Sequence, residues 1–157
     1  MNVNVLVCPY CGEIHDVSKN EFFNNPACNV CDGLLLPKAP VDVNERVFKR
    51  FIAYSTLPVV GNFWGPWSGK SQEVAEVVAS LADTFQTDAI FLRVNCEQEQ
   101  VLANSYKLVD IPTFILFKSK VEYRRIQGAL SERDFHAWLE RYLRVKRKKA
   151  TYHRSSV

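Results

Sequence analysis

Two pairs of cysteines near the N-terminus restrict this chain more than any other feature of its sequence. Two residues separate Cys8 from Cys11 and Cys28 from Cys31, and sixteen residues lie between the pairs. This spacing is typical of a structural zinc site, because each turn directs two thiolates toward one point. Four thiolates fill the tetrahedral shell of Zn²⁺, so we expect one structural zinc ion without an open catalytic position. A module of about thirty residues has too small a core to fold alone, and metal binding would supply the missing free energy.

The same four cysteines could instead form two disulfides in a secreted domain. The segment Met1-Asn-Val-Asn4 lacks the basic start of a signal peptide, and no apolar run approaches the roughly 18–20 residues of a membrane span. We therefore predict a zinc site in a soluble, cytoplasmic protein that has no membrane partner. His15 is interpreted as a surface residue. Cys96 follows an apolar run and is interpreted as a small buried hydrophobic residue.

The remaining sequence has the composition of a globular domain. Of its 157 residues, 47% are hydrophobic and 24% are charged, which excludes a wholly disordered chain. We predict a zinc ribbon over residues 1–36, a larger domain over 37–143 and a basic tail over 144–157. The tail has six basic residues and no acidic one, whereas residues 1–143 have 14 basic and 17 acidic residues, a net charge of −3. Such a terminal run is most often a solvated end of the chain.

Apolar periodicity beyond residue 37 predicts strands that alternate with helices. Buried strands are expected at 59–64 and 89–95, and a hairpin at 113–117 and 121–127. Helices are expected from about residue 44, over about 74–85, over about 98–106, and from Ser131, where Asp134 completes a capping box. Leu34–Pro40 has two prolines and is expected to be a linker or an edge strand. The order of these elements indicates an α/β domain.

Three short motifs give the chain a resemblance to a known family. The segment Phe63-Trp-Gly-Pro-Trp-Ser-Gly-Lys-Ser71 resembles the thioredoxin active-site stretch FWAPWCGPC, which lies on a strand, a turn and a helix. Val109–Thr113 is similar to the cis-proline loop of that family, and Gln127–Ser131 to the glycine turn before its last helix. With the N-terminal cysteine pairs, the chain resembles the thioredoxin 2 subgroup. The resemblance implies a thioredoxin-like fold, in which helices flank a central mixed sheet, with an N-terminal zinc ribbon.

The same resemblance assigns roles to individual positions. Ser68 and Ser71 align with the two catalytic cysteines, and Asn62 aligns with the buried acid that moves protons during exchange. The residues that align with the substrate groove are Trp67, Gly69, Ile111, Pro112 and Gly128. In the family this groove binds extended segments of other proteins by strand addition. A thioredoxin reductase is an expected partner only if the cysteines are restored, and nucleic acid is not an expected partner.

Serine at both catalytic positions leaves two main hypotheses. Disulfide exchange needs an attacking thiolate and a second thiol, so the chain as written is not expected to be a dithiol oxidoreductase. Either it is a natural groove-binding module without redox chemistry, or it is an active protein-disulfide reductase whose cysteines were changed to serine in the laboratory. Asn62 favours the first hypothesis, and the intact Trp67 and Gly69 favour the second. A third hypothesis is a zinc-ribbon module that binds nucleic acid or protein through its basic tail.

Overall fold

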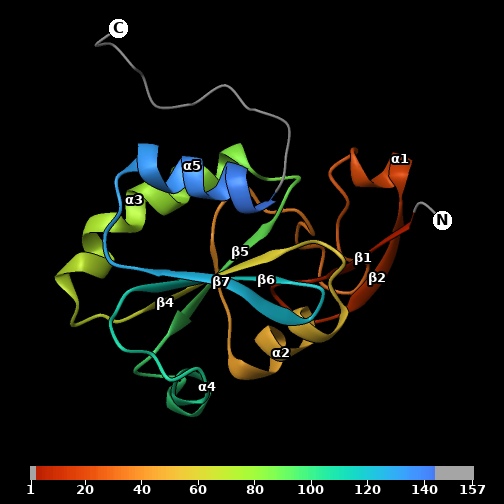
Figure 1. Cartoon of the computed structure of the whole chain (residues 1–157). Coiled ribbons are helices and arrows are strands. Elements are labelled where there is room, and N and C mark those ends of the chain that lie inside the picture. The colour runs from red at the N-terminus through yellow and green to blue at the C-terminus, as the bar shows by residue number, and fades with distance from the viewer. Residues whose placement is uncertain (1–2, 144–157) are drawn as a thin grey trace, which may run out of the picture.

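The computed structural model describes residues 3–143, and the predicted basic tail lies outside them. The chain begins with a hairpin of β1 (Val3–Val7) and β2 (Ile14–Ser18), followed by the short helix α1 (Lys19–Phe22). A capping box starts α1, because the Ser18 hydroxyl accepts a hydrogen bond from the Glu21 amide and the Glu21 carboxylate accepts one from the Ser18 amide. The four-cysteine module is therefore built on a two-stranded hairpin (Figure 1).

A five-stranded mixed sheet forms the centre of the larger part, in the order β3-β5-β4-β6-β7. Its strands are β3 (Val41–Asp42), β4 (Val59–Trp64), β5 (Ile90–Asn95), β6 (Thr113–Lys118) and β7 (Val121–Gln127). The first three are parallel to one another, whereas β6 is antiparallel to both of its neighbours. The sequences of the central strands are nearly continuous apolar runs, because both faces of the sheet are buried there.

Helices cover both faces of this sheet. They are α2 (Glu45–Tyr54), α3 (Gly69–Thr84), α4 (Gln100–Ser105) and α5 (Glu132–Leu143). Figure 1 shows α3 and α5 together on one side of the sheet and α2 on the other. Each side has its own buried cluster: Val74, Val78 and Leu81 of α3 lie in one, and Phe48 and Phe51 of α2 lie in the other. A central mixed sheet flanked by helices is the architecture that the resemblance implies.

The hairpin module and the larger domain share one hydrophobic core. Leu6, Leu35 and Leu36 of the module are buried in the same cluster as Phe48 and Phe51 of α2. Hydrogen bonds also join the two parts, since the Thr56 amide donates to the Val5 carbonyl at 3.0 Å and the Val5 amide donates to the Thr56 hydroxyl at 3.0 Å. The boundary at residue 36 stays a prediction, but burial is continuous across it.

The predicted elements of the larger domain are present, with small differences at their ends. The Ser131 hydroxyl accepts a hydrogen bond from the Asp134 amide at 3.1 Å, which is one of the two hydrogen bonds of the predicted capping box, and the last helix begins at Glu132. Leu34–Pro40 forms neither a free linker nor a strand: Leu34 makes an isolated bridge to Ala27, and the next two leucines are buried. The two-residue strand β3 was not predicted. No helix among residues 3–143 is long and apolar enough to cross a membrane.

Candidate functional site

The loop between β4 and α3 carries both serines that the sequence singles out. Ser68 has an extended backbone and is the N-cap of the 16-residue helix α3. Its hydroxyl accepts a hydrogen bond from the Ser71 amide at 3.1 Å and donates one to the Ile111 carbonyl at 3.3 Å. One side chain therefore satisfies an amide at the start of the helix and ties the loop to the segment before Pro112.

The second serine is buried beneath the same loop. Only 5% of Ser71 is exposed, and its hydroxyl accepts a hydrogen bond from the Gly65 amide at 3.3 Å. Among residues 3–143, neither hydroxyl has a hydrogen-bond partner that could remove its proton. The partners of Ser68 there are a backbone amide and a backbone carbonyl, and that of Ser71 is a backbone amide, whereas a serine nucleophile needs an adjacent base.

Asn62 lies in the middle of β4 and is only 5% exposed. Its side-chain oxygen is buried and has no hydrogen-bond partner among the described residues. The side chain borders a cavity of about 170 Å³, which Arg93 of the adjacent strand also lines. The Arg93 guanidinium is directed elsewhere, because it pairs with Asp42 at 3.3 Å and lies 4.1 Å from the Trp64 ring centroid. A neutral amide therefore occupies this buried position, and it has no acidic proton to exchange.

A second loop lies against the first and contains the predicted cis proline. The peptide bond between Ile111 and Pro112 is cis. The Gly128 amide donates to the Pro112 carbonyl at 2.9 Å, and Gly128 has a φ of +94°, a conformation that favours glycine. The Ile111 amide donates to the Asp110 carboxylate at 3.0 Å, a contact that the sequence analysis did not anticipate. The structure thus brings Ser68, Ile111, Pro112 and Gly128 together as expected.

Trp67 forms the exposed edge of this site. The side chain is 62% exposed, and its ring lies so close to Gly65 that a Cβ atom there would come within 2.6 Å of it. Any other residue at position 65 would displace the ring. Apart from its chain neighbours and the backbone of its own helix, no atom of the described residues lies within 4 Å of the position that a Gly69 Cβ would take, so this side of the loop is open.

The four N-terminal cysteines converge as their spacing predicts. All four sulfur atoms lie within 4.8 Å of one another, with 3.5 Å between Cys8 and Cys31 and 3.6 Å between Cys11 and Cys28. These separations far exceed an S–S bond of about 2.05 Å, and all five cysteines of the chain are free. Four sulfurs at about 2.3 Å from one tetrahedral ion would be about 3.8 Å apart. The cluster is therefore a possible metal site.

Burial and hydrogen bonds shift the pKa values of Cys8 and Cys28 in opposite directions. Burial raises the pKa of Cys8 to about 12. Burial also acts to raise the pKa of Cys28, but hydrogen bonds from the Cys31 and Val30 amides and from neighbouring thiols outweigh it and lower this pKa to about 6. The Val30 amide lies 3.3 Å from the Cys28 sulfur. The second turn therefore stabilises a thiolate, which is the form that binds metal.

Two arginines of α2 hold the first cysteine turn from outside the module. Arg46 donates to the Cys11 carbonyl at 3.0 Å, and Arg50 donates to the Gly12 carbonyl at 2.6 Å. Gly12 has a φ of +85°, which a side chain would strain. The metal cluster is thus attached to a helix of the larger domain by hydrogen bonds as well as by apolar packing.

Two other residues have environments that bear on their predicted roles. His15 is half-buried rather than on the surface as predicted, and its Nε2 lies 3.2 Å from the Asn29 side-chain oxygen and 3.3 Å from the Asn29 amide. The histidine therefore joins the hairpin to the second cysteine turn. Cys96 packs against the core, and burial raises its pKa to about 11. Cys96 is therefore half-buried at the edge of the core, rather than fully buried as predicted.

Comparison with known proteins identifies the fold family. The Thioredoxin family model matches residues 39–141. Thioredoxin C-3 of Corynebacterium nephridii is 31% identical over 139 residues, which are 88% of this chain and 95% of that protein. The chain belongs to the thioredoxin family. Thioredoxins are thiol-disulfide oxidoreductases, and the part of the chain that matches their family model includes the loop of Ser68 and Ser71.

Solved structures agree with this family membership. A mutant thioredoxin from Halobacterium salinarum is 25% identical, with a TM-score of 0.62, and the match covers 71% of this chain and 96% of that one. Malassezia sympodialis thioredoxin is similar in fold, with a TM-score of 0.61 and 20% identity over 67% of this chain and 91% of that chain. The thioredoxin family model leaves out the four cysteines, which all precede residue 39.

Proposed function

We propose that this protein is a thioredoxin-family binding module without dithiol redox activity, and that it belongs to the zinc-ribbon subgroup called thioredoxin 2. The main support for this proposal is the hydrogen bonding of the two serine hydroxyls. Ser68 caps α3 and bonds to Ile111, and Ser71 bonds to Gly65, so each hydroxyl has a structural partner in the loop. A match over 88% of the chain must also include part of residues 1–36, which supports the subgroup.

The chemistry of the described residues supports the loss of redox activity. A hydroxyl cannot form a mixed disulfide, and exchange needs two thiols in reach of each other. Cys96 is a single thiol whose pKa burial raises to about 11. The other four cysteines surround one point and are better suited to a metal than to turnover. Asn62 adds to this, because an amide cannot take the proton that a resolving thiol releases.

A laboratory origin of the serines is the alternative. Trp67 and Gly69, which flank Ser68, match the thioredoxin stretch FWAPWCGPC. This is expected if only the cysteines were substituted. Asn62 argues against this origin, because a substitution made to trap a partner gives no reason to replace a buried acid. The codons at positions 68 and 71 of the natural gene distinguish the two histories directly.

The groove can still bind an extended protein segment in this proposal. Trp67 offers a large exposed ring, and a carbonyl oxygen such as that of Ile111 has a second lone pair besides the one used by Ser68. Backbone pairing beside Pro112 needs no sulfur. Affinity is expected in the micromolar range or weaker, because covalent capture is absent.

We further propose that the four-cysteine cluster holds one structural zinc ion. Four thiolate ligands and a tetrahedral set of sulfur positions fit Zn²⁺. The same ligands keep the metal from acting on a substrate, because no coordination position is open. Five free cysteines also agree with a reducing, cytoplasmic location. Elemental analysis of purified protein is expected to give one zinc per chain, and a metal-free protein or two disulfides by mass spectrometry would refute the zinc site.

Restoring the thiols tests the proposed loss of redox activity. The unmodified protein should not reduce insulin, whereas Ser68→Cys with Ser71→Cys should place a dithiol at the start of α3, where the helix favours a thiolate. With a thioredoxin reductase, this double variant should turn over slowly, and Asn62→Asp should raise its rate by about 10-fold or more. Substantial insulin reduction by the unmodified protein would overturn the proposal.

Groove binding has a separate test. Peptides recovered from partners that the immobilised protein captures would be titrated by calorimetry. Trp67→Ala should weaken binding, whereas Phe23→Ala, which removes an exposed aromatic ring from the hairpin module, should leave it unchanged. Equal binding by Trp67→Ala and the unmodified protein for every peptide would contradict the assignment of the groove.

A further inference from the structure

Ile111 is the residue through which an extended segment can pair with the groove. Pro112 has no N–H group, and its carbonyl already accepts a hydrogen bond from the Gly128 amide at 2.9 Å. Thr113 begins β6 and pairs with β4 on one side and with β7 on the other. Strand addition beside Pro112 therefore depends on the N–H and C=O groups of Ile111.

Both of these backbone groups already have partners within the chain. The Ile111 amide donates to the Asp110 carboxylate at 3.0 Å, and the Ile111 carbonyl accepts a hydrogen bond from the Ser68 hydroxyl at 3.3 Å. The carbonyl has a second lone pair for another partner, whereas the amide has a single proton. The Asp110 carboxylate therefore occupies the position that a carbonyl oxygen of an added strand would take.

Exchange of this carboxylate for a peptide carbonyl is unfavourable by itself. A hydrogen bond to an ionised acceptor is about twice as strong as a hydrogen bond between neutral groups. An added strand therefore replaces a stronger acceptor at the Ile111 amide with a weaker one, unless the displaced carboxylate gains a new partner. A neutral segment offers no such partner, and an acidic segment adds repulsion.

The Asp110 carboxylate has no other partner in the described part of the chain. The side chain is exposed, and among residues 3–143 its carboxylate accepts a hydrogen bond only from the Ile111 amide. No ion pair of these residues includes Asp110. When the carboxylate turns away from the amide, its full negative charge is therefore available to a cation of the bound segment.

Two exposed apolar side chains are sequence neighbours of this contact. Val109 precedes Asp110 and is 85% exposed, and Trp67 precedes Ser68 and is 62% exposed. Exposed apolar side chains that lie together at a binding groove favour apolar residues in the partner. The described residues thus present a negative charge and apolar surface beside one backbone pairing position.

We propose that Asp110 determines the specificity of the groove, and that it selects extended apolar segments with a lysine or arginine beside the residue that pairs with Ile111. The basic side chain binds the Asp110 carboxylate while a carbonyl oxygen of the segment replaces it at the Ile111 amide. This inference rests on the groove binding proposed above and adds the class of partner to it.

Three synthetic peptides test this selection by calorimetry. They are capped peptides that alternate valine and threonine and differ only at the central residue, which is lysine, glutamine or glutamate. The unmodified protein should bind the lysine peptide about 3-fold more tightly than the glutamine peptide, as expected for an exposed ion pair, and the glutamate peptide most weakly. Asp110→Ala should bind the lysine and glutamine peptides equally. It should bind the glutamine peptide about 5-fold more tightly than the unmodified protein does, because its Ile111 amide is free.

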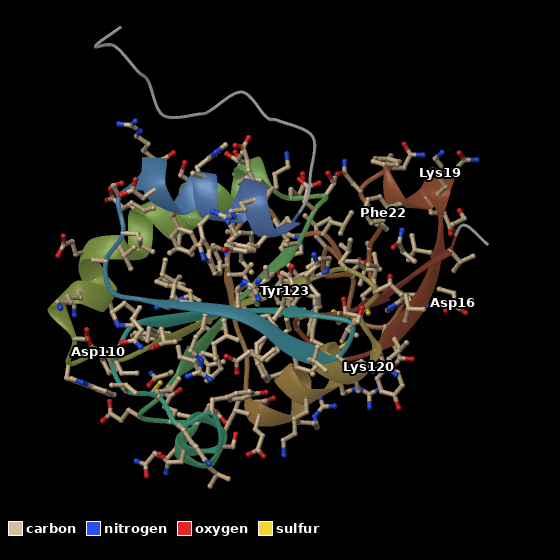
Figure 2. The ribbon with its side chains drawn as sticks, viewed as in Figure 1. Asp16, Lys19, Phe22, Asp110, Lys120 and Tyr123 are labelled. Carbon is tan, nitrogen blue, oxygen red and sulfur yellow. The ribbon has the colours of Figure 1, made fainter. Side chains whose placement is uncertain are left out.

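Asp16→Ala is the matched control. Asp16 is also exposed, and Figure 2 shows it on the hairpin module, across the molecule from Asp110. The control removes the same charge and should keep the preference for lysine. A second measurement needs no peptide: hydrogen exchange of the Ile111 amide, followed by NMR, should be faster in Asp110→Ala than in the unmodified protein or the control, because the carboxylate protects this proton. If Asp110→Ala does not fold, Asp110→Asn should likewise lose the preference for lysine.

The possible results separate this inference from the function on which it rests. Equal loss of the lysine preference in Asp16→Ala would mean that net charge alone decides. An unchanged preference in Asp110→Ala, or unchanged exchange of its Ile111 amide, would exclude the carboxylate as the cause. Each of these results overturns the inference and leaves groove binding intact. If none of the three peptides binds the unmodified protein or Asp110→Ala, groove binding itself fails, and the inference fails with it.

Discussion

Removal of the Ser68 hydroxyl should lower the free energy of unfolding by about 2 kcal/mol. An N-cap hydrogen bond, here from the Ser71 amide at 3.1 Å, contributes about 1 kcal/mol. The bond to the Ile111 carbonyl adds about 1 kcal/mol, since a typical hydrogen bond has a net contribution of that size. Ser131→Ala is the matched control, because the Ser131 hydroxyl caps α5 through its bond to the Asp134 amide and makes no second hydrogen bond to any described residue. Its expected cost is therefore about 1 kcal/mol.

Urea unfolding of Ser68→Ala, Ser131→Ala and the unmodified protein measures both costs. The slope against urea should not change, because neither variant alters the surface exposed on unfolding. In a thermal melt, Ser68→Ala should lower the Tm by about 4–8 °C, given about 2–4 °C per kcal/mol at this size. Ser68→Thr, which keeps a hydroxyl cap, should recover most of the loss. If Ser68→Ala costs no more than Ser131→Ala, the link between the serine loop and Ile111 does not stabilise the fold, and the reasoning fails.

Three further outcomes follow from burial. Cys28→Ala, or removal of metal by a chelator, should unfold the ribbon and also lower the Tm of the larger domain, because Leu35 and Leu36 belong to the shared core; an unchanged melt would contradict this. Cys96 should be alkylated slowly near pH 8 and faster as the pH rises toward its pKa of about 11, whereas fast labelling of the folded protein would show that it is accessible. Asn62→Leu should raise the unfolding free energy by about 1 kcal/mol, because it removes a buried oxygen that has no hydrogen-bond partner among the described residues. Urea unfolding that shows a loss of stability instead would indicate a bound water.

The sequence predicted the parts of this fold that depend on local pattern. The spacing of the cysteines predicted the cluster of four sulfur atoms. Each of the two C-x-x-C turns brings two sulfur atoms together, and the site forms when the two turns come into contact. Apolar runs predicted β4, β5 and β6 because strands buried on both faces have few polar positions. The resemblance of the loop motifs to the thioredoxin family assigned Ser68 and Ile111 to neighbouring parts of one site, and the Ser68 hydroxyl donates to the Ile111 carbonyl. Each of these signals is contained in a few consecutive residues.

Contacts between distant segments could not be predicted in this way. Arg46 and Arg50 look like ordinary residues on the exposed face of a helix, yet both donate to carbonyls of the first cysteine turn. Asp110 belongs to the motif that resembles the cis-proline loop. The motif does not indicate that the Asp110 carboxylate accepts a hydrogen bond from the Ile111 amide, because this contact depends on how the loop turns. The capping box of Ser18 and Glu21 is a local feature, in contrast to these long-range contacts. Its S-x-x-E pattern is visible in the sequence, but it was not among the predicted helix starts.

The core shared by ribbon and domain also determines when the first residues can finish folding during synthesis. The N-terminal hairpin leaves the ribosome first, and its four thiols can meet once residue 31 has emerged. Its apolar face has no cover until α2 follows, because Phe48 and Phe51 belong to the same buried cluster as Leu6 and Leu36. Until then, a nascent chain exposes Leu6, Leu35 and Leu36 to other chains, which is the condition that favours aggregation. A ribosome pausing before residue 54 would prolong that exposure, whereas a pause after α2 would come when the ribbon is already covered.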